Sequence, residues 1–290
     1  MRILRGALGL AVASAVLVGA NLAHAESVLN RGNSGDPETL DPQKTSTVYE
    51  GNILRDLFEG LVIHSAAAKI LPGAAESWTT SPDGLTWTFK LRPNAKWSNG
   101  EPVTADDFVY SYQRMMNPAT GSQYANMLYI IKNAEEVNKG KAAPETLGVK
   151  AVDKTTLQFT LSGPTPYFIE LLAHQSSFPV NKAVVEKFGK DWVKPENFVS
   201  NGAFVLKENV PHDHITIVRN AAHYDAAKFK LDKVIYVPTE DRAAALRRFQ
   251  AGEIDMNDDV PTDQIKFIRQ NLKAEFRPQP YLGTYYFVFN

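Results

Sequence analysis

The stretch from Thr86 to Tyr110 reads TWTFKLRPNAKWSNGEPVTADDFVY and decides the fold class of this chain. Apolar and polar residues alternate over its first six positions, so Trp87, Phe89 and Leu91 share one face of a strand. Ser98–Gly100 then has the composition of a tight turn, because an Asn-Gly pair tolerates positive φ. The first half of the stretch therefore predicts a strand followed by a turn.

A helix is expected in the second half. Thr104 caps it, with its hydroxyl accepting from the amide of Asp107, while Asp106 and Asp107 place negative charge at the positive helix end. Apolar residues follow at helical spacing and stop at Pro118: Phe108, Val109, Tyr112, Met115 and Met116. The two carboxylates are therefore interpreted as a helix start rather than as a catalytic pair.

The same periodicities predict alternating strands and helices along the rest of the chain, which is typical of an α/β class with mixed sheets. The expected strands cover residues 27–31, 149–152, 156–161, 199–206 (after a turn), 215–218, 231–237 and 281–290. The expected helices cover residues 49–61, 166–173, 183–188, 239–252 (capped by Thr239) and 263–272.

Several short segments are more informative in their exact residue order than in their pattern of apolar and polar positions. They are Leu40–Pro42 (LDP), Asn52–Leu61, Ala75–Trp78 (AESW), Trp87–Arg92, Lys96–Gly100 (KWSNG) and Pro102–Val109 (PVTADDFV). Together they resemble the dipeptide, oligopeptide and nickel family of periplasmic solute-binding proteins, and most closely its oligopeptide-binding members. The resemblance covers nearly all of residues 26–290, which is little more than the first half of a family member.

The resemblance implies a periplasmic binding protein-like fold of two lobes with an extra small domain. In its terms, residues 26–58 and 181–282 form lobe I, residues 59–180 form the additional α+β domain, and residues 283–290 begin a strand that crosses to a second lobe. The aromatic run before Asn290 reads as the interior of a sheet with no turn after it. We therefore expect a fragment whose second lobe is truncated.

Composition and charge limit the function classes. The chain has 290 residues with a net charge of −1 and no long run of one sign, which argues against nucleic acid as a partner. It has no cysteine, which excludes disulfides, thiolate catalysis and cysteine-ligated metals. A lipid anchor on an N-terminal cysteine is excluded as well. A soluble periplasmic protein is the expectation that fits these facts.

The first 25 residues are predicted to be an export signal. Arg2 and Arg5 form a positive start, residues 6–20 are uncharged, and Ala25 ends a small-x-small cleavage motif, so that the mature chain begins at Glu26. A membrane anchor is the competing interpretation. It is disfavoured because alanine and glycine make the run weakly apolar and a cleavage motif follows it.

Enzyme motifs are missing from the sequence. It contains no Gly-x-Ser-x-Gly elbow, no phosphate loop and no His-Glu-x-x-His. His212-Asp213-His214 is the tightest histidine cluster, and a solvated hairpin turn is favoured over a metal site because no third ligand lies nearby. The sequence therefore predicts a protein that is not an enzyme and that needs no cofactor or metal.

Candidate binding residues come from the resemblance. In the family the ligand peptide lies extended between the lobes and pairs with protein backbone as a strand would, while its side chains enter hydrated pockets. The resemblance maps this role onto Ser46, Thr47, Val48, Tyr124, Asp258, Asp259, Tyr281 and Gly283. Ser46 departs from members with an acidic residue there, so no charge-based role is expected at that position.

Each of these positions also has an ordinary structural interpretation. Tyr124 and Tyr281 fit core aromatic residues, Val48 fits a strand residue, and Asp258-Asp259 fits an exposed turn pair. The chain is also one residue shorter than relatives at the Asp258 loop. These alternatives stay open at the level of the sequence.

The expected function is a monomeric periplasmic receptor that binds oligopeptides and delivers them to an ABC permease and its ATPase. Within the family, a murein peptide, a dipeptide, nickel or a haem chelate is an alternative ligand. Outside it, a periplasmic hydrolase or a chaperone-like module is the alternative. The family's acidic residue for the peptide ammonium belongs to the second lobe, so it has no counterpart among these residues.

Overall fold

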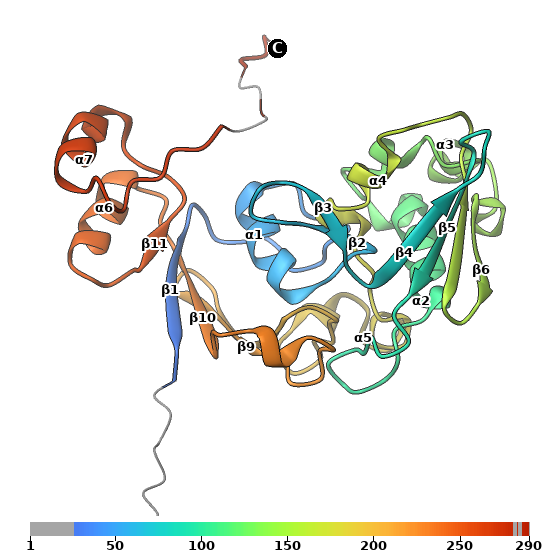
Figure 1. Ribbon diagram of the computed structural model, residues 1–290, viewed down its shortest axis with the longest axis horizontal. Coiled ribbons are helices and arrows are strands. Elements are labelled where there is room, and N and C mark those ends of the chain that lie inside the picture. The colour runs from blue at the N-terminus through green and yellow to red at the C-terminus, as the bar shows by residue number, and fades with distance from the viewer. Residues whose placement is uncertain (1–25, 281–282, 284–285, 290) are drawn as a thin grey trace, which may run out of the picture.

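The computed structural model describes residues 26–280, 283 and 286–289 (Figure 1). The predicted signal peptide, with Ala25, lies outside them, and Glu26 is the first residue described. No helix of the described part is both long and apolar enough to cross a membrane. The helices are α1 (Val48–Leu57), α2 (Ala105–Met116), α3 (Ala134–Asn138), α4 (Phe168–Leu171), α5 (Lys182–Phe188), α6 (Arg242–Gln250) and α7 (Ile265–Asn271).

A five-stranded mixed sheet joins the start of the described chain to its last third. Its order is β11-β1-β10-β9-β8, with β1 parallel to both β10 and β11 and the other pairs antiparallel. The strands are β1 (Val28–Asn33), β8 (Phe204–Val210), β9 (His214–Arg219), β10 (Lys233–Pro238) and β11 (Met256–Asn257). Because β1 lies between β10 and β11, residues far apart in the sequence share one sheet.

A four-stranded antiparallel sheet is formed by the middle of the chain, on the right of Figure 1. Its order is β4-β5-β7-β6, and α2 packs against it. The strands are β4 (Ala75–Thr80), β5 (Thr86–Leu91), β6 (Val149–Asp153) and β7 (Thr156–Thr160), and a separate hairpin pairs β2 (Val62–His64) with β3 (Ile70–Pro72). Phe159 lies at the centre, with Phe89 and Tyr112 edge-on at 5.7 and 5.0 Å.

The buried apolar residues fall into two clusters. The first, called core A, runs from Leu61 to Ala173 and lies between the four-stranded sheet and α2. The second, called core B, combines Leu40–Phe58 with Phe178–Tyr236 and lies under the five-stranded sheet. The two clusters meet between Phe58 and Leu61 and between Ala173 and Phe178. The domain boundaries after residues 58 and 180 stay a prediction.

Polar side chains join the two cores. Arg114 on α2 makes a two-pronged ion pair with Asp41, whose side chain is 4 % exposed. Asn201 exchanges hydrogen bonds with the backbone of Glu59, donating at 2.8 Å and accepting at 3.0 Å. A buried ion pair and buried hydrogen bonds therefore connect the two cores.

The stretch Thr86–Tyr110 folds as predicted into β5, a turn and α2. Trp87, Phe89 and Leu91 are all buried. Thr104 and Asp107 form a capping box at the helix start, as the sequence predicted. The Asp107 carboxylate accepts from the Thr104 amide at 2.8 Å and from the Thr104 hydroxyl at 2.9 Å.

Two predicted helix boundaries were wrong. The helix expected over residues 49–61 ends at Leu57, because Phe58 turns to an extended conformation (φ −127°, ψ 157°) that buries its ring in core B. The helix expected from Thr239 begins at Arg242, and Asp241 caps it by accepting from the Ala244 amide. Thr239 donates instead to the side chain of Asn257 at 3.0 Å.

The strand predicted over residues 281–290 is not formed by its described residues. Gly283 and residues 286–289 have no regular secondary structure. Phe287 is 83 % exposed and Phe289 is 98 % exposed. None of these described residues belongs to one of the sheets, so an aromatic pattern alone does not produce a strand.

Candidate functional site

Ser46, Thr47 and Val48 form the start of α1, directly after the Asp41 turn. Thr47 is the N-cap and has an extended backbone (φ −111°, ψ 156°). Glu50 closes the cap, because its Oε2 accepts from the amides of Ser46 and Thr47, each at 3.0 Å, and from the Thr47 hydroxyl at 2.7 Å. The cap thus uses up the two backbone N–H groups that precede the helix.

The backbone groups that remain open at this edge are the Ser46 carbonyl and the Val48 amide. The carbonyl accepts only a long bond of 3.4 Å from the Tyr124 hydroxyl, and the amide has no partner among the described residues. Because Thr47 is extended, these two groups point to the same side, which is the pattern that one residue of a parallel strand requires. With Val48 58 % exposed, an extended chain can reach the edge.

Tyr124 lies against this edge, as the sequence suggested. It precedes a short 3-10 turn (Ala125–Leu128) and is half-buried. Its ring centroid is 4.6 Å from that of His174. The tyrosine is therefore held from one side by a histidine while its hydroxyl points at the Ser46 carbonyl.

No sequence pattern points to His174, which is a single histidine after a short helix. Burial, with a smaller contribution from the charge of Arg55, lowers the pKa of His174 to about 4, so its ring is neutral at pH 7. The neutral Nδ1 accepts from the Ser176 amide at 3.3 Å. An aromatic neighbour of a candidate binding residue can be found only once the fold brings distant segments together.

Asp258 and Asp259 attach their loop to β1 and α1. Asp258 accepts from Arg31 at 2.9 Å and from Asn52 at 2.8 Å. Asp259 accepts from the hydroxyl of Ser34 at 3.1 Å. Both carboxylates are thus engaged with side chains on other elements, and the loop they belong to is not a free turn.

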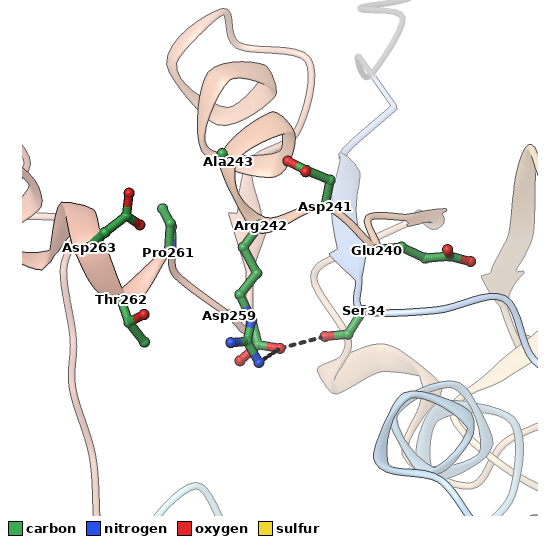
Figure 2. Close-up of a pocket in the computed structure, with 9 residues that line it drawn as sticks. All are labelled: Ser34, Glu240, Asp241, Arg242, Ala243, Asp259, Pro261, Thr262 and Asp263. Atoms are coloured by element: carbon green, nitrogen blue, oxygen red, sulfur yellow. Dashed lines mark hydrogen bonds and ion pairs between the residues drawn. The ribbon is translucent and has the colours of Figure 1, made fainter.

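An open pocket of about 520 Å³ lies beside Asp259 (Figure 2). Figure 2 shows Ser34 and Arg242 converging on the Asp259 carboxylate, with Asp263 across the opening. Four carboxylates and one arginine line the pocket, so its electric field favours cations. The carboxylates are those of Glu240, Asp241, Asp259 and Asp263, and the arginine is Arg242. Nothing else in the described residues specifies what this pocket would hold.

Helix α1 connects the two parts of the candidate site. Its first turn carries the Ser46–Val48 edge, and Asn52, one turn later, donates to Asp258. Gly283 is exposed and Tyr281 lies outside the described residues. The structure thus brings Ser46 and Tyr124 into contact, while the assignment of all eight positions to ligand binding stays a prediction.

The groups considered for catalysis or metal binding have structural roles. His212 (φ 64°) lies in the turn between β8 and β9, as predicted. His214 bonds carboxylates through both ring nitrogens, at 2.7 Å to Asp213 and 3.1 Å to Glu208, and these bonds raise its pKa. Among the described residues no group of three potential ligands could hold a metal ion.

The Asp107 carboxylate is also engaged in hydrogen bonds with nearby residues. It accepts from the amide and hydroxyl of Thr104 and, at 3.4 Å, from the indole of Trp97. Burial nevertheless raises its pKa. The carboxylate therefore belongs to the helix start, in line with the interpretation from sequence.

Comparison with known families and proteins gives a consistent result. A profile described as "Bacterial extracellular solute-binding proteins, family 5 Middle" matches residues 69–290. The periplasmic oligopeptide-binding protein OppA of Escherichia coli is 43 % identical over 283 residues, which are 97 % of this chain and 52 % of that protein. The periplasmic murein peptide-binding protein MppA of E. coli is 41 % identical over 290 residues, covering 99 % of this chain and 53 % of that protein.

Solved structures agree with this likeness. The structure of Haemophilus influenzae OppA in complex with the peptide RPPGFSPFR superposes with a TM-score of 0.83 at 36 % identity, covering 86 % of this chain and 49 % of that one. The chain spans about half the length of the curated relatives it matches. The relatives are named as binding proteins rather than enzymes.

Proposed function

The chain belongs to family 5 of the bacterial extracellular solute-binding proteins, and we propose that it serves peptide import as part of a periplasmic receptor. In this proposal the protein captures extended oligopeptides and delivers them to an ABC permease with its ATPase. Two relatives that are 43 % and 41 % identical are named as a periplasmic oligopeptide-binding protein and a periplasmic murein peptide-binding protein. In the same proposal the protein is exported, soluble and monomeric and has no catalytic activity.

The observation that carries the proposal is the open edge at the start of α1. The Ser46 carbonyl and the Val48 amide form the donor and acceptor pair that one residue of a parallel peptide would use. Recognition through backbone groups is independent of the ligand's side chains, so the edge suits a receptor for many sequences. When a peptide binds, its amide would donate to the Ser46 carbonyl and replace the long hydrogen bond from the Tyr124 hydroxyl.

Binding and release would follow hinge closure. A ligand that touches two lobes stabilises the closed form by its differential contacts with the open and closed states. The chain covers about half the length of its relatives, and we expect weaker peptide binding by this chain alone than by a protein of the relatives' length. Calorimetry with tri- to pentapeptides on both proteins tests this, and equal affinity would contradict it.

Murein peptide is the second candidate ligand, because the murein peptide-binding relative is 41 % identical, almost as similar as the oligopeptide-binding one. Parallel titrations with a murein tripeptide and with tripeptides of common amino acids distinguish the two. A strong preference for the murein tripeptide would replace the oligopeptide proposal.

The backbone edge itself can be tested by Val48→Pro. Position 48 is the first residue of α1, where proline is tolerated, and Thr47 already has the extended conformation that proline requires of its predecessor. The substitution removes the amide donor and replaces an exposed side chain. We expect about a tenfold loss of peptide affinity, the value of one ordinary hydrogen bond, with little change in stability.

Val48→Ala is the matched control, since it shortens the side chain and keeps the amide. We expect Val48→Ala to bind peptide as the parent does. If both variants bind as tightly as the parent, the Val48 amide does not contact the ligand and the proposed edge is wrong.

A further inference from the structure

A second pocket lies between the two cores and away from the acidic pocket of Figure 2. It has a volume of about 360 Å³ and is bounded by the Asp41 turn, the end of α2 and the segment after α5. Its charged lining consists of three cations and one carboxylate: Lys44, Arg114, Lys190 and Asp41. The pocket is thus positive, in contrast to the first one.

Arg114 is only partly satisfied in this pocket. Its Nη1 donates to Asp41 at 3.1 Å and to Gln43 at 2.5 Å, and its Nη2 donates to Asp41 at 2.6 Å. A guanidinium has five N–H groups, so the Nε–H and one Nη2–H have no hydrogen-bond partner among the described residues. The side chain is 13 % exposed, which leaves these donors to whatever occupies the pocket.

The two lysines are also uncompensated. Neither Lys44 nor Lys190 forms an ion pair with a described residue, whereas Lys194, four residues after Lys190, pairs with Asp191 at 3.2 Å. The acidic residue nearest to the pocket on α5, Glu186, faces Lys182 at 3.9 Å. The positive charge around Arg114 therefore remains available to a ligand.

We propose that this pocket binds a small organic carboxylate that carries an apolar group. The open donors of Arg114 match a carboxylate, and the two ammonium groups add attraction at the rim. Val185 and Val193 line the same pocket and provide an apolar wall. Its volume falls within the range of small-molecule sites, and a bare inorganic anion would leave the wall unused. Peptide capture is not required for this inference.

The test measures binding of phenylacetate, acetate and inorganic phosphate to the purified chain at low salt. Calorimetry gives the affinities, and the fluorine NMR signal of Trp192, which lines the pocket, gives a local signal in 5-fluorotryptophan-labelled protein. We expect phenylacetate to bind more tightly than acetate or phosphate. The double variant Lys44→Gln/Lys190→Gln should bind it about tenfold more weakly, as expected for lost charge-assisted contacts.

The control is Lys150→Gln/Lys207→Gln, which removes two exposed lysines on β6 and β8 that do not line the pocket. It should bind phenylacetate as the parent does. Phosphate binding as tight as phenylacetate binding, an equal loss in the control, or no binding of any of the three anions would each overturn the proposal.

Discussion

At the residue scale, one side chain decides which backbone groups stay open for a ligand. Glu50 accepts from the Ser46 and Thr47 amides, and this leaves the next amide, that of Val48, without a partner among the described residues. A capping box normally serves helix stability alone. Here it also sets which backbone groups a ligand strand can use, namely the Ser46 carbonyl and the Val48 amide.

His174 gives a prediction at the same scale, because its folded-state pKa of about 4 lies below the ordinary value for histidine. As the pH falls from about 6.5 to about 4, the unfolded chain takes up a proton that the folded chain does not, so stability is lost over that window. Above pH 6.5 both states are neutral at this site. His174→Gln removes this dependence.

We therefore expect His174→Gln to gain stability relative to the parent by up to about 3 kcal/mol between pH 7 and pH 4. Urea unfolding followed by circular dichroism at several pH values measures this difference. His64→Gln, which replaces an exposed histidine on β2, is the control. A difference between parent and His174→Gln that is the same at both pH values would contradict the assigned environment.

At the element scale, α1 organises the candidate site. Its first turn forms the open backbone edge, and Asn52 holds Asp258. Tyr236 on β10 donates to Asp56 at 2.6 Å, which ties the helix to the five-stranded sheet. At its end the chain turns at Phe58 and approaches Gly202. Displacing this helix would therefore move the edge and the Asp258 loop together.

Gly202→Ala tests how tightly the end of α1 is packed. A Cβ at position 202 would lie 2.4 Å from the Leu57 carbonyl carbon, which is backbone and cannot rotate away. We expect a loss of about 1–3 kcal/mol in the free energy of unfolding, as is typical of overpacking. Gly163→Ala is the control, because a Cβ there meets no atom within 4 Å. Equal stability of the two variants in urea would show that the close approach is absent.

Much of the element order could be predicted from the sequence, but the contacts of the site could not. Alternation in Thr86–Leu91 and the polar start at Thr104 are local signals, and the predicted β5 and α2 are confirmed. The end of α1 was missed because Phe58 fits the helical periodicity while core B draws it out of the helix. The contact of His174 with Tyr124 depends on tertiary structure, which no local pattern encodes.

At the scale of the whole molecule, the two cores are separate in their apolar residues and joined by polar ones. Core A draws on residues 61–173, and core B combines segments from both sides of it. The Asp41–Arg114 pair and the Asn201–Glu59 bonds cross between them in buried surroundings. Removing one partner of a buried ion pair leaves an uncompensated charge, at a cost of about 3–5 kcal/mol.

This arrangement predicts a single unfolding transition for the described part of the parent chain. The four tryptophans report on the two cores separately, since Trp87 and Trp97 lie in core A, Trp78 packs against it, and Trp192 lies in core B. Fluorine NMR of 5-fluorotryptophan-labelled protein in urea should give one midpoint for all four signals. In Asp41→Asn the Asp41–Arg114 ion pair between the two cores is lost. We therefore expect the unfolding midpoint of the Trp192 signal to separate from those of the other three tryptophans. Asp106→Asn, an exposed carboxylate at the start of α2, should keep them coincident. Separate midpoints already in the parent would mean that the buried polar bonds do not couple the cores.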